Sequence, residues 1–175
     1  MQKVDTVANT DEQQVVILEL ARESYGVEIA RVQEIIRMQP ITRVPNGPPC
    51  IEGVTNLRGR IIPVLDLRKR LGFEATALAR QGRIVVAELG EHIVGMVVDG
   101  VSEVFMISPD AIEPPSMLVT TTDSRYLRGV AKIGDRLILL LDLALILTGA
   151  DDVDLTRNGA EHEAPASQTL DGRRN

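Results

Sequence analysis

The feature that most constrains the fold of this chain is an internal repeat. Sliding the 175-residue sequence along itself by 69 residues pairs residues 15–45 with residues 84–114, and eight of these 31 positions are identical. Average residue frequencies would give about two identities in such a window. The similarity therefore indicates two copies of one structural plan. The identical pairs are Val16/Val85, Glu19/Glu88, Leu20/Leu89, Gly26/Gly95, Val32/Val101, Glu34/Glu103, Pro40/Pro109 and Pro45/Pro114.

Two further matches extend the repeat toward the C-terminus in the same order. A shift of 70 aligns Leu57-Arg58-Gly59 with Leu127-Arg128-Gly129, and a shift of 76 aligns Leu65-Asp66-Leu67 with Leu141-Asp142-Leu143. A period of this length is too long for one turn of a solenoid and suits two small β-barrels. We therefore expect similar halves at roughly 15–67 and 84–143, between which elements can be exchanged. Four pairs should coincide on superposition: Gly26 with Gly95, Val32 with Val101, Arg58 with Arg128, and Asp66 with Asp142, with both Gly26 and Gly95 in turns of positive φ.

Short apolar runs rich in Val and Ile predict strands inside these halves. Helical signals are weaker: Ile29, Val32 and Ile36 recur at helical spacing, and the segments 66–71 and 143–147 could each form one or two turns. The fold class expected is all-β with minor helix. The runs that predict strands are 15–20, 61–67, 84–89, 93–98 and 137–141.

The two ends of the chain differ in composition from its middle. Residues 150–175 carry six acids and three bases, and residues 1–13 carry three acids and one base. Of 25 acids and 19 bases in all, 16 acids and 15 bases remain between them, so the body is nearly neutral. Because the C-terminal segment has no apolar periodicity, we expect a disordered acidic tail at 150–175, a flexible N-terminus at 1–13 and a folded domain at 14–149.

Several classes of function are disfavoured by the residues themselves. A single cysteine, Cys50, excludes an internal disulfide, and with two scattered histidines it does not make a zinc site. No dense basic run suggests a nucleic-acid surface, and no stretch is long and apolar enough to enter a membrane. Phosphate-loop and nucleophile-elbow motifs are also absent from the sequence. These observations predict a cytoplasmic protein that is not an enzyme and has neither metal nor cofactor.

Three blocks of sequence resemble the CheW family of chemotaxis coupling proteins. They begin at Tyr25-Gly-Val-Glu, Ile51-Glu-Gly-Val and Val94-Gly-Met-Val, and the resemblance extends from about residue 14 to residue 148. It implies two five-stranded SH3-like barrels that share a hydrophobic interface. It also implies a non-enzymatic adaptor that joins the cytoplasmic tip of methyl-accepting chemotaxis receptors to the regulatory domain of the histidine kinase CheA, and that is recruited to membrane-associated receptor arrays.

The resemblance also assigns candidate binding residues. It places Arg58 on the receptor-facing surface, where a planar guanidinium can bind carboxylates or helix-end carbonyls. Glu34 has two readings, a binding role or a shared architectural role, because Glu103 recurs at the matching place. Gly53 and Gly59 are expected to serve the backbone near this interface. The full set of receptor-binding candidates is Val32, Glu34, Ile35, Arg58 and Val104.

Other readings remain open from the sequence. The main alternative is a small-molecule-binding β-barrel sensor domain, against which stands the 2% aromatic content of the chain. Two further alternatives are closer to the adaptor reading: a detached kinase regulatory domain, and the adaptor half of a fusion with a receiver domain. An enzyme is the least favoured reading.

Overall fold

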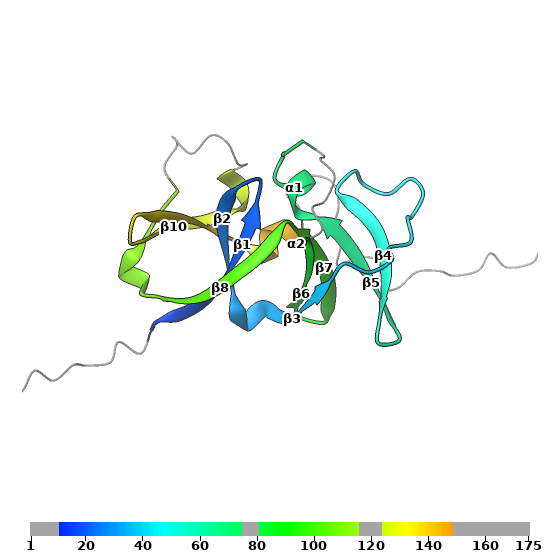
Figure 1. Cartoon of the computed structure of the whole chain (residues 1–175), viewed down its shortest axis with the longest axis horizontal. Coiled ribbons are helices and arrows are strands. Elements are labelled where there is room, and N and C mark those ends of the chain that lie inside the picture. Colours follow the sequence, from blue (N-terminus) through cyan, green and yellow to red (C-terminus); the bar gives the residue numbers. More distant parts are fainter. Residues whose placement is uncertain (1–10, 75–80, 116–123, 149–175) are drawn as a thin grey trace, which may run out of the picture.

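The computed structural model describes residues 11–74, 81–115 and 124–148 (Figure 1). The predicted tail at 150–175 and residues 1–10 of the predicted flexible N-terminus lie outside this range. The strands and helices in chain order are β1 (Gln13–Leu20), β2 (Glu23–Glu28), η1 (Ile29–Arg31), β3 (Val32–Arg37), β4 (Ile51–Leu57), β5 (Arg60–Asp66), α1 (Leu67–Arg70), β6 (Arg83–Leu89), β7 (His92–Val98), β8 (Gly100–Ile107), η2 (Pro109–Ala111), β9 (Ile112–Glu113), η3 (Ser124–Tyr126), β10 (Leu127–Ile133), β11 (Arg136–Leu141) and α2 (Leu143–Thr148).

The expected all-β fold with minor helix is confirmed, and the five predicted strands correspond to β1, β5, β6, β7 and β11. The helical spacing of residues 29–36 was misleading. A single 3-10 turn, Ile29–Arg31, leads there into strand β3. Because β3 carries a bulge between Val32 and Glu34, its apolar residues depart from strict alternation. No helix in the described part of the chain is long and apolar enough to cross a membrane.

The strands form two sheets that lie side by side (Figure 1). The five-stranded sheet has the order β3-β6-β7-β5-β4, and the six-stranded sheet has the order β8-β1-β2-β11-β10-β9. Each sheet draws strands from both copies of the repeat, since β1 and β2 pair with the later strands β8 and β11. The sixth strand, β9, has two residues, and its place in the other sheet is taken by the isolated bridge between Thr42 and Val54.

The two parallel strand pairs have the same register. Val64 lies opposite Gly95 in one sheet, and Leu140 lies opposite Gly26 in the other. A Cβ atom on Gly95 would lie 2.9 Å from Ile84 Cγ2, and one on Gly26 would lie 2.8 Å from Leu140 Cδ2. The predicted equivalence of the two glycines is therefore confirmed. The turn role predicted for them is wrong, because both lie inside strands without positive φ and allow close packing instead.

The predicted equivalence of Arg58 and Arg128 is wrong. Gly53 in β4 and Gly129 in β10 both follow a bulge and face equivalent residues of the neighbouring strand, which fixes the offset here at 76 residues. Under this offset Arg128 corresponds to Glu52, and it lies within a strand instead of a turn. Its guanidinium pairs with Glu28. The three matching letters Leu-Arg-Gly thus belong to different parts of the two copies.

One hydrophobic core joins the two sheets. It contains buried residues of β1 and β2 from the six-stranded sheet and of β6 and β7 from the five-stranded sheet, together with residues of both α-helices. Each sheet also has a smaller apolar cluster of its own. Burial of such surface is the main favourable contribution to folding, so the shared core favours a fixed arrangement of the halves.

Two arginines of α1 reinforce this arrangement with polar contacts. Arg68 Nη1 lies 2.9 Å from Asp99 Oδ1, and Asp99 Oδ2 accepts a hydrogen bond from Ala21 N at 2.8 Å. Arg70 Nε donates to Ile146 O at 3.0 Å, which connects α1 to α2. Surfaces on the two sheets are therefore held at a defined separation.

Asp66 and Asp142 occupy equivalent places at the starts of α1 and α2. Asp66 Oδ1 accepts hydrogen bonds from Arg68 N at 2.9 Å and Lys69 N at 3.4 Å, and Asp142 Oδ1 accepts one from Leu145 N at 3.1 Å. Both aspartates therefore cap a helix, and their predicted equivalence is confirmed. Asp66 is almost fully buried, and desolvation raises its pKa above the ordinary value of 3.8 despite the two backbone hydrogen bonds.

Replacing Asp66 with asparagine is expected to change the pH dependence of stability. Because the folded-state pKa is raised, the contribution of Asp66 is greatest below pH 3.8 and is lost as the pH rises through the folded-state pKa. Asparagine keeps the capping oxygen and cannot ionise. In urea titrations, the free energy of unfolding of Asp66→Asn should therefore increase relative to that of the natural protein as the pH rises from 3.8 through the folded-state pKa of Asp66. A difference that does not vary with pH would contradict the prediction.

Candidate partner-binding surface

The β4–β5 hairpin turns through Arg58 and Gly59. Their φ angles are 50° and 86°, and two successive positive φ values are typical of the tight two-residue turns that join antiparallel strands. Asn56 Oδ1 accepts a hydrogen bond from Gly59 N at 2.8 Å and closes the turn. The side chain of Arg58 is consequently presented at the tip, with 80% of its surface exposed.

Glu34 on β3 contacts this arginine. Its Oε2 lies 2.8 Å from Arg58 Nη2, and the Glu34 side chain is only 19% exposed. An exposed ion pair of this kind contributes about 0–1 kcal/mol to stability. Its main effect is therefore to hold the guanidinium in one direction beside edge strand β3.

The same ion pair has a counterpart in the other half. Glu103 Oε1 on β8 lies 2.8 Å from Arg136 Nη1 at the start of β11. In each copy a glutamate of the edge strand thus binds an arginine of the following hairpin. This supports the architectural reading of Glu34 without removing the binding reading, because only Arg58 stands at the tip of its turn.

A hollow of about 380 Å³ opens beside the ion pair, and we call it the arginine hollow. Apolar side chains and one amide line it together with two arginines and one glutamate, which leaves one excess positive charge. It can accept an anionic side chain that is flanked by aliphatic groups. Its lining residues are Gln33, Glu34, Leu57, Arg58, Arg60, Ile62 and Ile93.

Ile35 and Val104 occupy equivalent places on the two edge strands. Ile35 faces Val85 across β3 and β6, and Val104 faces Val16 across β8 and β1. Their exposed fractions are 41% and 50%. Neither lines the arginine hollow, so they offer separate apolar contacts at the edges of the two sheets.

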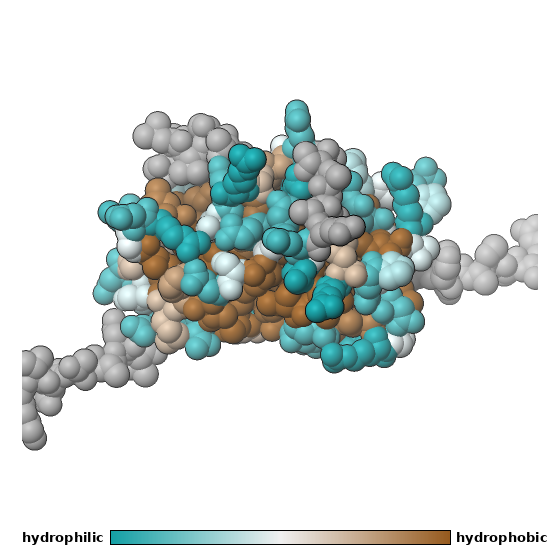
Figure 2. All heavy atoms as spheres, viewed as in Figure 1, coloured by the Kyte–Doolittle hydropathy of each residue, from teal (hydrophilic) through white to brown (hydrophobic). Residues whose placement is uncertain are grey.

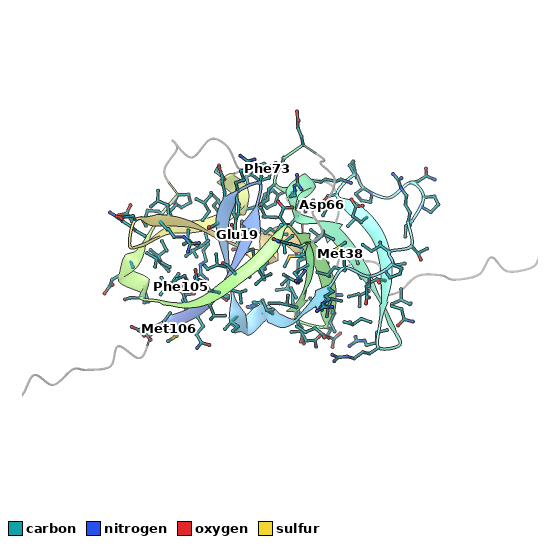
Figure 3. The ribbon with its side chains drawn as sticks, in the orientation of Figure 1. Glu19, Met38, Asp66, Phe73, Phe105 and Met106 are labelled. Carbon is teal, nitrogen blue, oxygen red and sulfur yellow. The ribbon has the colours of Figure 1, made fainter. Side chains whose placement is uncertain are left out.

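Hydrophobic residues form a band across the face shown in Figure 2, from β8 toward β3. Met106, 53% exposed, belongs to β8 and lies at the end of that strand farther from the five-stranded sheet (Figure 3). Met106 is not among the binding residues predicted from the sequence. The signal was present, since Val104 and Met106 are two positions apart and project from the same side of a strand.

Val32 has a different environment from the other candidates. It is half-buried and packs against the core that joins the two sheets. Its contribution to a binding surface is therefore indirect, through the position of β3.

Glycine is required for different structural reasons at positions 53 and 59. Gly53 has φ +147°, and a Cβ atom there would lie 2.0 Å from Thr42 O, because Thr42 pairs with the neighbouring Val54 of β4. Gly59 has φ +86° and open space around the missing Cβ. Gly53 thus permits the close approach of Thr42 to β4, whereas Gly59 permits only the turn.

Comparison with known proteins places this architecture in a family. The sequence model of the CheW-like domain matches residues 14–151. The chain belongs to the CheW family. Its relatives include the chemotaxis protein CheW of Klebsiella aerogenes, 36% identical over 85% of this chain and 89% of the relative. The CheW of Thermotoga maritima is 32% identical over 77% of this chain and 87% of that protein.

A solved CheW structure is similar to most of this chain. The scaffolding protein TtCheW from Thermoanaerobacter tengcongensis superimposes with a TM-score of 0.73 and is 39% identical, covering 78% of this chain and 92% of that one. The two-sheet arrangement of this CheW-family chain is therefore shared with a scaffolding protein.

Cys50 in this CheW-family chain is equivalent to Tyr126 under the 76-residue offset. Asp66 N donates to Cys50 O, and Asp142 N donates to Tyr126 O, both at 2.8 Å. Cys50 is buried, so its thiol fills a place that an aromatic ring occupies in the second copy.

Proposed function

We propose that this CheW-family adaptor couples methyl-accepting chemotaxis receptors to the regulatory domain of CheA and catalyses no reaction itself. The observation that carries the proposal is the match of residues 14–151 to the CheW-like domain, which spans both sheets. An adaptor needs two separate binding surfaces in a fixed relation. The shared core and the contacts of Arg68 and Arg70 supply such a relation.

The receptor-facing surface in this proposal includes the tip of the β4–β5 hairpin and the exposed edge strands. Arg58 supplies hydrogen-bond donors for a carboxylate or a helix-end carbonyl, while Ile35 and Val104 supply apolar contacts for the cytoplasmic helical hairpin of the receptor. Glu34 orients Arg58, and Val32 fixes β3 from inside.

Binding through this surface should be weak for a single pair of molecules. The body of the chain is nearly neutral, with 16 acids and 15 bases between residues 14 and 149, so no strong overall charge attracts a partner. Modest interfaces of this kind reach high occupancy when many are linked, which suits recruitment to membrane-associated receptor arrays. The relatives named above are chemotaxis proteins and give no support to a small-molecule sensor.

Titration calorimetry with two cognate fragments tests the proposal. We expect the receptor cytoplasmic tip and the CheA regulatory domain each to bind with micromolar affinity, and to bind together without competition. Absence of binding by either fragment, or mutual exclusion, would overturn the coupling function.

A further inference from the structure

Arg60 and Arg136 begin equivalent strands, β5 and β11, yet their surroundings differ. Arg136 is held by three groups of its own sheet. Its Nη1 donates to Glu103 Oε1 at 2.8 Å, its Nη2 donates to Ser24 Oγ at 3.1 Å, and Nη2 lies 3.9 Å from Glu19 Oε1. The guanidinium of Arg136 is therefore satisfied within the protein.

The equivalent groups around Arg60 are not available to it. The counterpart of Glu103 is Glu34, which binds Arg58, and the side chain of Ile93, the counterpart of Ser24, cannot accept a hydrogen bond. The counterpart of Glu19 is Glu88, which forms no ion pair with Arg60 in the described part of the chain. Within residues 11–74, 81–115 and 124–148, Arg60 makes neither an ion pair nor a side-chain hydrogen bond. Arg60 is thus without a partner at the position where Arg136 of the other copy has three.

Arg60 also lines two adjoining hollows. One is the arginine hollow, and the other, of about 420 Å³, lies between the starts of β5 and β7. These strands pair only from Val64 and Gly95 onward, so their first residues diverge and open the second hollow. Ile61, 64% exposed, lies on its wall beside Arg60. Arg60 is therefore bordered on both sides by hollows that contain apolar side chains, and the second hollow also contains Glu91.

We propose that Arg60 binds a carboxylate on the cytoplasmic helical tip of the receptor, in addition to the contact made by Arg58, and supplies the excess positive charge of the arginine hollow. This inference rests on the proposed function. Glu34 neutralises Arg58, so the excess positive charge of the hollow belongs to Arg60. A guanidinium can bind a carboxylate through two parallel hydrogen bonds, and Leu57, Ile62 and Ile93 of the hollow offer apolar contacts beside them. The matching receptor segment is a helix with an acidic residue flanked by aliphatic ones.

Binding of the cognate receptor tip to the full chain tests this assignment, with Arg136→Gln as the matched control. We expect Arg60→Gln to weaken receptor binding about tenfold, Arg60→Glu to weaken it further, and both to leave the melting temperature and CheA binding unchanged. Arg136→Gln should bind the receptor like the natural protein. Lysine substitution of one acidic residue of the receptor tip should restore binding to Arg60→Glu.

The possible failures are distinguishable. If the natural protein does not bind the receptor tip, the proposed function itself is wrong. If it binds and Arg60→Gln binds equally well, or if Arg136→Gln is weakened to the same extent, the role of Arg60 is overturned while coupling stands. Failure of every acidic-to-lysine change in the receptor tip to restore binding would also overturn it.

Discussion

Replacing Gly53 with alanine is expected to lower the free energy of unfolding by about 3 kcal/mol. The added Cβ would lie 2.0 Å from Thr42 O, and the φ of +147° is one that L side chains rarely adopt. The clash is with backbone, so no side-chain rotation can relieve it. It would strain the hydrogen bonds from Thr42 N to Val54 O and from Val54 N to Thr42 O, of 2.8 and 2.9 Å. Urea unfolding followed by circular dichroism measures the loss.

Gly59→Ala is the matched control for this substitution. Gly59 also has positive φ, but nothing lies within 4 Å of the added Cβ, so the expected loss is about 1 kcal/mol. Receptor binding should decline for Gly53→Ala only in proportion to the unfolded fraction. Equal losses of stability for the two variants, or lost binding by a fully folded Gly53→Ala protein, would refute the backbone role.

Strands with a buried apolar run were predictable from the sequence. β1, β6 and β7 are buried along most of their length, so their Val- and Ile-rich runs carry a clear signal. β3 was not predictable in this way, because the bulge between Val32 and Glu34 and the preceding 3-10 turn place apolar residues at apparently helical spacing. The bulge and the 3-10 turn thus produced a sequence pattern that resembles the periodicity of an α-helix.

The repeat was visible in the sequence, but identical residues did not determine how the two copies align in their later strands. Leu-Arg-Gly occurs at the end of β4 and again at the start of β10, which are opposite ends of equivalent strands. An offset of 76 would have aligned Gly53-Val54 with Gly129-Val130 as well as both Leu-Asp-Leu segments. Hydrogen-bond register decides between the offsets, because it shows which residues of the two copies face equivalent partners in the neighbouring strand.

The candidate site was predictable only in part for a related reason. The sequence supplied Arg58 and Glu34 as separate candidates, whereas their ion pair spans 24 residues and depends on how β3 is placed beside the hairpin. Arg136 donates a hydrogen bond to Ser24, whereas Arg60 lacks this partner because Ile93 is the counterpart of Ser24 in the other copy. Such differences become interpretable only when the equivalent positions are known.

Replacing Arg58 with glutamate is expected to weaken receptor binding more than tenfold while leaving stability almost unchanged. The Arg58 side chain is 80% exposed, and surface substitutions usually change stability by less than about 0.5 kcal/mol. Positive φ is no worse for glutamate than for arginine, since both carry a Cβ atom. Binding should suffer because the change removes a cation from the hairpin tip and sets a second carboxylate beside Glu34.

Measurements of the melting temperature and of binding to both partners separate the possibilities for Arg58. The CheA regulatory domain should bind Arg58→Glu as it binds the natural protein, because the proposal places the kinase on a different surface. Glu34→Gln should reduce receptor binding less than Arg58→Glu does, since it loosens the guanidinium without removing it. Early melting of Arg58→Glu would indicate a structural role, and normal receptor binding would exclude Arg58 from the interface. A larger defect for Glu34→Gln than for Arg58→Glu would instead make the glutamate the receptor contact and the arginine its support.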